Sequence, residues 1–204
     1  MLRPGDVNWM IAGKGVSHSE RLEGGFQQTG GTLELLQAWV ALPTEDEECD
    51  PSFAHHPTSA LPTFKEAGTF SRLIAGSAFG VTAPVQTHSP LFYLHVELQA
   101  GAKTPLPTGY PERAAYVVNG KVEVAGQAYT RGQLLVFAPE ASPILTALEH
   151  STVMLLGGEP VGPRHIWWNF VASSKEHIEQ AKADWQSGRI ALPANDREAL
   201  IPLP

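Results

Sequence analysis

Glycine and proline divide this chain into many short apolar segments. The 204 residues include nineteen glycines and seventeen prolines. Both residue types end regular elements, and short apolar segments separated in this way are typical of a β-sandwich or β-barrel. Nine segments have the composition of strands: Val7–Ile11, Ser17–Arg21, Leu33–Leu42, Phe70–Ala75, Leu91–Leu98, Ala114–Val118, Lys121–Ala125, Gln133–Ala138 and Thr152–Leu156. The sequence therefore predicts an all-β fold.

Residues typical of turns and loops predict three connecting segments. Asn119 and Gly120 both tolerate positive φ, so a tight type I′ hairpin is predicted over residues 116–124. A second turn is predicted over residues 125–127. Residues 43–69 are rich in proline, threonine and acidic residues without periodicity, and we interpret them as a connection between two lobes.

One helix is predicted near the C-terminus. Ser173 and Glu176 match a capping box, with Ser173 as the N-cap. Three apolar residues follow at helical spacing: Ile178, Ala181 and Trp185. Gly188 is placed to end the helix, which predicts an amphipathic helix over Ser174–Ser187. Residues 190–204 contain three prolines and are predicted to form an extended strap.

Composition narrows the classes of partner. The net charge is -7 and no block of lysine and arginine is present, which argues against direct nucleic-acid binding. The single cysteine, Cys49, follows four acidic residues that disfavour its thiolate, and it has no internal disulfide partner. No apolar run reaches the about 20 residues of a membrane span, and no signal-peptide pattern is visible. We expect a cytoplasmic protein without a membrane segment.

His18 and Glu20 form a candidate metal pair. Two residues apart on an extended segment they point the same way, so an imidazole nitrogen and a carboxylate oxygen can reach one cation. This pairing suits iron, zinc, copper or nickel. Such a metal usually has three or four protein ligands, so the others come from elsewhere or part of the site is lost. By itself the pair is more often a solvated surface feature.

Seven blocks of sequence resemble the pirin family, a branch of the cupin superfamily. They are Arg3–Asp6, Asn8–Gly13, Gly15–Glu20, Pro51–Pro57, Glu112–Gly120, Leu156–Pro160 and Arg164–Phe170. The resemblance implies two cupin lobes, each a double-stranded β-helix or jelly roll. Residues 1–50 would form the C-terminal part of the first lobe, which would be incomplete. Residues 51–204 would form the second lobe with the helix and tail.

The resemblance assigns roles to the candidate residues. His18 takes the histidine position of the second cupin motif in the first lobe, and Glu20 matches an additional ligand of the family. The two histidines of the first motif would precede Met1, so we expect iron, or another divalent transition metal, to be held weakly by half a ligand set. In the second lobe Pro107 and Gly109 take the histidine positions of the first motif and Arg113 the glutamate position. We expect that lobe to be structural and free of metal.

Other residues receive ordinary interpretations. His55 and His56 are adjacent and face opposite ways on an extended chain, so they do not share an ion. His88 and His95 are interpreted as surface or hydrogen-bonded core residues, and the Trp167-Trp168 pair as packing. No Ser-His-Asp order, phosphate loop or cysteine cluster is present. An incomplete first barrel would expose strand edges, so we expect the chain to self-associate.

Three functions stay open from the sequence. The resemblance implies a quercetin 2,3-dioxygenase type of oxygenase acting on a small aromatic substrate such as a flavonol, with Glu20 also accepting the hydroxyl proton. It equally implies a non-catalytic, metal-dependent cofactor that binds proteins or regulates transcription. The third alternative is an inactive, truncated product.

Overall fold

The chain forms two compact units in a computed structural model, which describes residues 3–19, 25–193 and 201–204. The barrel unit contains Met1–Met10 and Phe53–Pro160, and the second unit contains Ile11–Ser52 and Val161–Pro204. The boundary predicted near residue 50 between two lobes stays a prediction. None of the helices in the described ranges is long and apolar enough to span a membrane.

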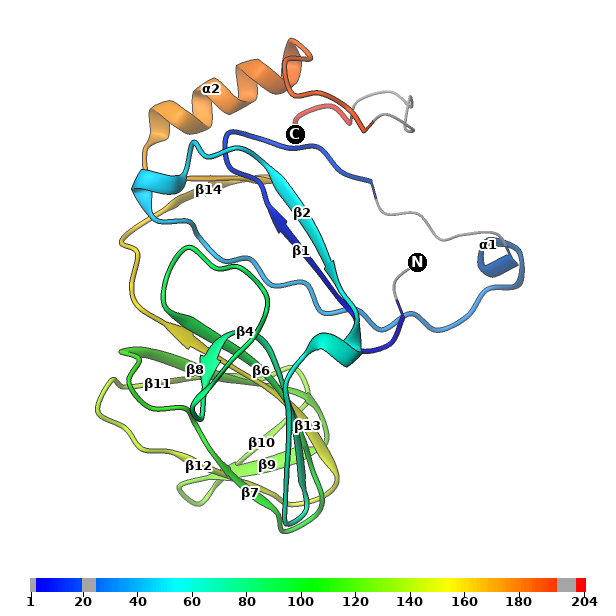
Figure 1. The fold of residues 1–204 in the computed structure, drawn as a ribbon, viewed down its shortest axis with the longest axis vertical. Helices are drawn as coiled ribbons and strands as arrows, with labels where there is room; N and C mark the ends of the chain where they lie inside the picture. Colours follow the sequence, from blue (N-terminus) through cyan, green and yellow to red (C-terminus); the bar gives the residue numbers. More distant parts are fainter. Residues whose placement is uncertain (1–2, 20–24, 194–200) are drawn as a thin grey trace. The chain divides into compact units, whose positions relative to one another are not determined.

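Two antiparallel sheets make up the barrel (Figure 1). The seven-stranded sheet has the order β11-β8-β13-β6-β4-β3, with β5 beside β4. Its strands are β3 Thr63–Glu66, β4 Thr69–Ala78, β5 Val81–Thr82, β6 Leu91–Leu98, β8 Glu112–Asn119, β11 Leu134–Phe137 and β13 Ser151–Gly158. The four-stranded sheet has the order β10-β9-β12-β7. Its strands are β7 Lys103–Pro105, β9 Lys121–Val124, β10 Gln127–Thr130 and β12 Ile144–Ala147.

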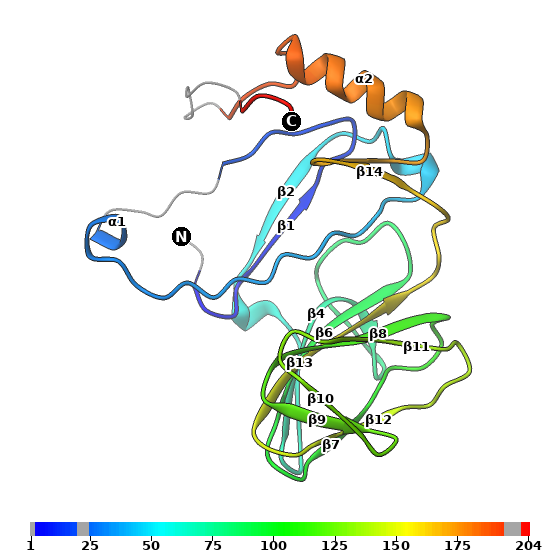
Figure 2. The same ribbon diagram turned by 180° about the vertical axis from the view of Figure 1, so that it is seen from behind.

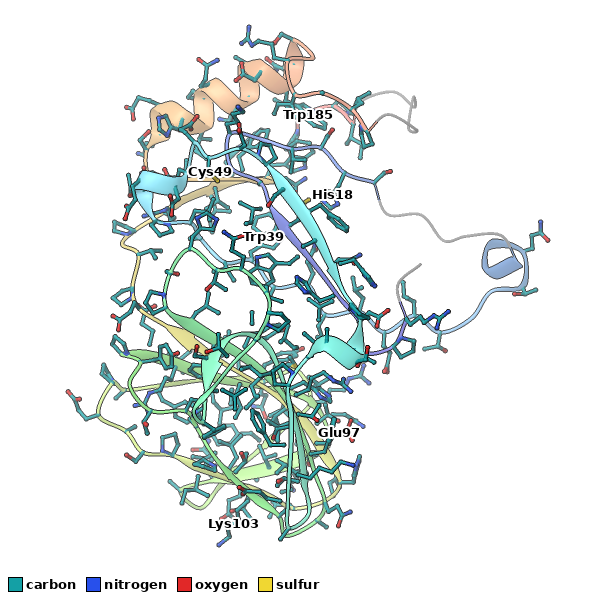
Figure 3. All side chains as sticks on the ribbon, in the orientation of Figure 1. His18, Trp39, Cys49, Glu97, Lys103 and Trp185 are labelled. Atoms are coloured by element: carbon teal, nitrogen blue, oxygen red, sulfur yellow. The ribbon has the colours of Figure 1, made fainter. Side chains whose placement is uncertain are left out.

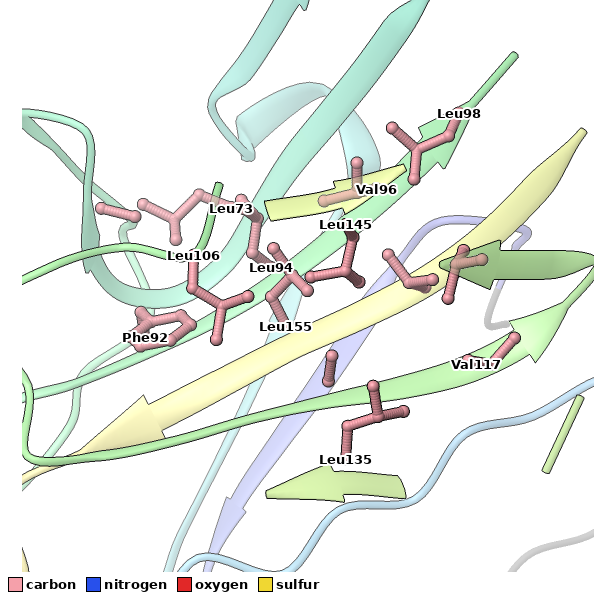
Figure 4. Close-up of a cluster of buried hydrophobic side chains, with 14 of the residues drawn as sticks. Leu73, Phe92, Leu94, Val96, Leu98, Leu106, Val117, Leu135, Leu145 and Leu155 are labelled. Carbon is pink, nitrogen blue, oxygen red and sulfur yellow. The ribbon is translucent and has the colours of Figure 1, made fainter. Parts of the chain in front are cut away.

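The barrel core is built by alternation along the strands. Every second side chain of β6 is buried: Phe92, Leu94, Val96 and Leu98. They join Val117 and Leu155 of the same sheet and Leu145 of the other sheet in one apolar cluster (Figure 4). Successive side chains of a strand face opposite sides, so each sheet turns one apolar face inward. The predicted all-β class is confirmed.

The hairpin predicted at Asn119-Gly120 is wrong. β8 and β9 pair in different sheets, so the chain passes from one sheet to the other at this point. Gly120 has φ of 81°, and a Cβ added to it would lie 2.4 Å from the carbonyl oxygen of His150. The second predicted turn is confirmed. Ala125 and Gly126 both have positive φ, and they join the antiparallel strands β9 and β10.

β1 and β2 form a separate two-stranded sheet. β1 spans Val7–Ile11, as predicted, and β2 spans Ser52–His56. Val7 and Trp9 of β1 pack against a small apolar cluster of the barrel unit: Leu61, Ala75, Val85 and Leu91. The predicted connection over residues 43–69 therefore contains β2 and β3, together with two short 3-10 turns at Thr44–Asp46 and Thr58–Ala60.

Two predicted strands outside the barrel are wrong. Leu33–Leu42 is an extended segment with no strand hydrogen bonding in the described structure, and most of its side chains are exposed. Strand composition is not sufficient here because a strand also requires a partner. Ser17–Ser19 is likewise irregular, and the rest of that predicted strand, Glu20 and Arg21, lies outside the described residues. A short helix, α1 at Gly25–Thr29, lies between these two segments.

The second unit contains the predicted C-terminal helix, α2 at Lys175–Gln186. Figure 2 shows it beside β14, His165–Trp167, which pairs with β15, Phe170–Ala172. Trp185 of α2 meets Trp168 of the hairpin edge to face, with ring centroids 5.4 Å apart. Aromatic contacts therefore fasten the helix to this hairpin.

The observed start of α2 differs by one residue from the predicted N-cap, whereas its end agrees with the prediction. Ser174, and not Ser173, is the N-cap, and its hydroxyl accepts from the backbone N–H of His177 at 3.2 Å. The capping box was therefore wrong by one residue, and Ser173 bonds elsewhere. Gly188 has φ of 70° just after the helix, as predicted for its end. In the tail, residues 191–193 and 201–204 are not helical, and residues 194–200 lie outside the described part.

Candidate functional site

His18 lies on an exposed, irregular segment of the second unit (Figure 3). Its predicted co-ligand Glu20 lies outside the described residues. Among the residues that the structure describes, no side chain is hydrogen-bonded or ion-paired to His18, and no three His, Cys, Asp or Glu side chains gather as a metal site. The structure therefore places one predicted ligand and does not assemble the set.

The kind and the number of donor atoms determine whether a metal ion fits at His18. An exposed imidazole is a good donor for a first-row transition metal, and a carboxylate two residues away would be a second donor of the right type. One described ligand does not define a coordination geometry. The kind of donor fits the group that the resemblance implies, whereas the number of donors does not.

Backbone and polar contacts fix the segment that leads to His18. Lys14 N–H donates to the carbonyl oxygen of Cys49 at 3.0 Å, and Gly13 approaches the same carbonyl so closely that an added Cβ would lie 2.0 Å from it. The Lys14 ammonium pairs with Asp50, which raises the pKa of Lys14 and lowers that of Asp50. Further along, the Ser17 hydroxyl donates to the Ala191 carbonyl. His18 is therefore exposed at the end of a tethered segment.

A buried ion pair lies in the same unit. The Glu47 carboxylate is 2.7 Å from Nε of Arg164, and both side chains are less than one-tenth exposed. Ser173 adds two donors to Oε2 of Glu47: its hydroxyl at 2.7 Å and its backbone N–H at 3.1 Å. Arg164 also donates to the Leu42 carbonyl at 2.7 Å. Sequence reasoning missed this network because nothing in the acidic run distinguishes Glu47 from its neighbours.

Asp6 and His55 form a second polar cluster, in the barrel unit. Asp6 accepts from the backbone N–H of Thr58 at 2.8 Å and from that of Arg3 at 3.0 Å. These bonds, chiefly the one from Thr58, lower the pKa of Asp6. His55 Nδ1 lies 2.9 Å from the Asn8 side-chain oxygen, and its Nε2 lies 3.7 Å from Asp6. This histidine is therefore held by neighbouring polar side chains.

The motif positions of the barrel unit converge near one pocket. Gly109 and Arg113 line a cavity of about 300 Å³. Pro107, at the remaining ligand position, is buried. Arg113 is buried as well, and its Nη2 donates to the carbonyl oxygens of Pro139 at 2.5 Å and Ala141 at 2.7 Å. The prediction that this lobe holds no metal stays a prediction.

Comparison with known proteins identifies relatives of both parts of the chain. Residues 93–191 match the pirin C-terminal cupin domain, and residues 1–40 match pirin. A pirin-like protein of Caulobacter vibrioides is 57% identical over the whole of this chain, which covers 71% of that protein. Human pirin is 28% identical over 92% of this chain and 66% of its own length.

Solved structures agree with the sequence relatives. A crystal structure of quercetin 2,3-dioxygenase from Acinetobacter baumannii superimposes with a TM-score of 0.85 at 28% identity. The match covers 92% of this chain and 67% of that one, so the chain spans about two thirds of the length of these relatives. The fold, the matched segments and the close Caulobacter relative together show that this chain belongs to the pirin family.

Proposed function

We propose that this chain is a metal-binding, pirin-like cupin of the quercetin 2,3-dioxygenase type, located in the cytoplasm, with His18 and Glu20 as metal ligands. The observation that carries the proposal is the structural match to a quercetin 2,3-dioxygenase, which extends over 92% of the chain. The matched pirin segment, residues 1–40, includes both proposed ligands. The substrate class that follows is a small aromatic compound such as a flavonol.

The proposed roles follow from the chemistry of the two side chains. When bound, iron or a similar divalent metal supplies the redox chemistry that dioxygen requires. The His18 imidazole offers a ring nitrogen as a ligand, and its exposed position leaves it accessible to a cation. The Glu20 carboxylate offers an oxygen and can also accept the proton of a substrate hydroxyl. Two ligands are half of the implied set, so weak binding is proposed unless further ligands are supplied.

Metal content and oxygen uptake test this proposal. The purified chain is loaded with Fe(II) and dialysed, its iron is measured by elemental analysis, and oxygen uptake is followed with quercetin. We expect sub-stoichiometric iron in the original chain and still less in His18→Ala. His165→Ala serves as the control because His165 is also exposed and lies on β14 of the same unit.

Each outcome decides one part of the proposal. One tightly held iron per chain that His18→Ala does not release would make the ligand assignment wrong. Tight iron that His18→Ala does release would support the ligands and contradict the proposed weak binding. Iron bound through His18 without any quercetin-dependent oxygen uptake would contradict the oxygenase activity.

A second candidate is a non-catalytic, protein-binding role, which one observation favours. Residues 31–40 are exposed throughout and carry several large apolar side chains: Leu33, Leu35, Leu36, Trp39 and Val40. Trp39 is labelled in Figure 3. Exposed apolar groups in a row favour association with another surface. Size-exclusion chromatography with light scattering tests the simplest form, self-association. A clean monomer at all concentrations would contradict it.

A further inference from the structure

Arg113 is a charged residue on the inward face of a barrel strand. On β8 it shares that face with Ala115 and Val117, which are both fully buried members of the barrel core. Arg113 itself is only 6% exposed. A guanidinium at such a position has lost most of its hydration, so its charge must be balanced by the groups around it.

Groups of the protein balance only part of the charge on Arg113. Nη2 of Arg113 donates to the carbonyl oxygens of Pro139 and Ala141. Its Nε is buried and has no hydrogen-bond partner within the described chain. Carbonyl oxygens are neutral acceptors, and across the described ranges no carboxylate is ion-paired with Arg113. A buried positive charge therefore remains without a negative partner.

The guanidinium borders a cavity that could hold such a partner. The pocket of about 300 Å³ lies between two loops, residues 106–111 and 138–143. Besides Arg113 its lining includes the exposed Thr108 and Ser142, whose hydroxyls can donate to an anion. Gly109 leaves open space at this point, since no atom lies within 4 Å of where its Cβ would be.

We propose that this pocket binds a small monocarboxylate, with the carboxylate group against Arg113. Both N–H bonds of Nη2 go to the Pro139 and Ala141 carbonyls and Nε is buried, so a carboxylate oxygen would accept a charge-assisted hydrogen bond from Nη1. The lining contains one cation and also the carboxylate of Glu140, so the local charge suits a singly charged ligand better than a doubly charged phosphate. Two of the three positions that the cupin motif gives to metal ligands, Gly109 and Arg113, line the pocket. The barrel thus holds an anion where the motif would place a cation, and this is independent of the proposed function of His18.

Acetate is the probe for the first test. Its binding to the full chain is measured by saturation-transfer NMR and calorimetric titration at constant ionic strength. We expect Arg113→Gln, which keeps side-chain donors for the two carbonyls, to weaken acetate binding at least about tenfold, as loss of a charge-assisted bond does. We expect Glu140→Gln to tighten it several-fold because a like charge is removed from the lining. Arg131→Gln and Glu149→Gln are matched controls, since both residues are exposed in the same unit and neither lines the pocket.

Inorganic phosphate is the second probe and separates the two classes of anion. Weaker binding of phosphate than of acetate is expected at pH 7. Tighter binding of phosphate would overturn the assigned class, and absence of acetate binding to the original chain would overturn the site. Unchanged acetate affinity in a folded Arg113→Gln variant, checked by circular dichroism, would also overturn it. If Arg113→Gln does not fold, the acetate affinity of Glu140→Gln is the deciding measurement. An acetate affinity equal to that of Glu149→Gln would contradict the proposal.

Discussion

The barrel unit and the second unit are stabilised by different kinds of contact. In the barrel unit sixteen buried apolar side chains form one cluster between two sheets. In the described part of the second unit the buried apolar residues are only Ala172 and Ile178, and its elements are held together by the Glu47–Arg164 pair and by aromatic contacts of α2. Apolar side chains are present in both units, since Leu33 and Trp39 of the second unit are more than half exposed. Hydrophobic composition alone therefore does not produce a core; facing sheets do.

The largest effect should come from truncating a barrel leucine. Leu94 is fully buried in the cluster, so Leu94→Ala removes apolar contacts and leaves a cavity. We expect the free energy of unfolding to fall by about 2–5 kcal/mol. Leu35→Ala is the matched control in the exposed segment, where Leu35 is 48% exposed and a change within about 0.5 kcal/mol is expected. Urea unfolding followed by circular dichroism measures both. Equal losses in the two variants would contradict the comparison.

Strands that carry their own alternating pattern were predictable from the sequence. β1 and β6 begin and end at the predicted residues. Apolar side chains alternate along each strand, and each strand packs this apolar face against other apolar side chains. Leu33–Leu42 has the same composition but no strand partner in the described chain, and pairing is not a local property. Asn119-Gly120 allows a tight turn, yet local geometry cannot decide whether the chain stays in one sheet or crosses to the other.

The candidate site was predictable only as a motif. His18 was identified from its neighbours in sequence, but its exposure, and the lack of a second ligand beside it among the described residues, depend on the tertiary arrangement. Arg113 was noted as a position that cannot hold a metal, whereas its buried charge and the adjoining pocket became visible only in the folded barrel. Glu47 is one of several consecutive acidic residues, and only Arg164, distant in sequence, distinguishes it.

A second test removes the polar anchor of the second unit. Glu47→Ala leaves the buried Arg164 guanidinium without its carboxylate and takes an acceptor from Ser173. Loss of one member of a buried pair destabilises by about 3–5 kcal/mol, and a loss of about 3 kcal/mol is expected here. Tryptophan fluorescence during urea unfolding is a suitable signal, since Trp39, Trp167, Trp168 and Trp185 all lie in this unit.

The neighbouring glutamate provides the control for this test. Glu48 is 71% exposed, and Glu48→Ala should change the free energy of unfolding by less than about 1 kcal/mol. A Glu47→Ala variant as stable as Glu48→Ala would mean that the second unit is not held by this ion pair.

A third, smaller effect concerns the start of α2. Ser174→Ala removes the hydroxyl that accepts from the His177 N–H, and loss of an N-cap costs about 1 kcal/mol. Ser174→Asp should keep the acceptor and restore stability because a carboxylate also suits a helix N-terminus. Amide hydrogen exchange in the first turn of α2 measures the change locally. Equal protection in Ser174→Ala and the original chain would contradict the assigned cap.

The smallest effect tests a polar group on the outer face of the barrel sheet. His95 lies on the side of β6 opposite the core, with Arg72 as its cross-strand neighbour and the Glu97 carboxylate 3.9 Å from its Nε2. Its Nδ1 is buried without a hydrogen-bond partner among the described residues. Burial lowers the pKa of His95 below its ordinary value of 6.5, Arg72 adds to the lowering, and Glu97 opposes it. The folded chain therefore resists a proton that the unfolded chain accepts.

The sign of the pH dependence follows from that difference in proton binding. Between the lowered pKa of folded His95 and the ordinary value of 6.5, the unfolded state binds more protons, so stability falls as the pH falls through this range. Above this pH range His95 does not contribute to the pH dependence of the free energy of unfolding. The carboxyl of Asp6, whose pKa is also lowered, acts in a separate and more acidic range below its ordinary 3.8.

Urea unfolding at several pH values between 7 and about 5 measures the slope of stability against pH, and His95→Gln should flatten this slope while exposed His150→Gln should not. A slope that His95→Gln leaves unchanged would show that the barrel tolerates a proton on this face, and that other titratable groups cause the slope.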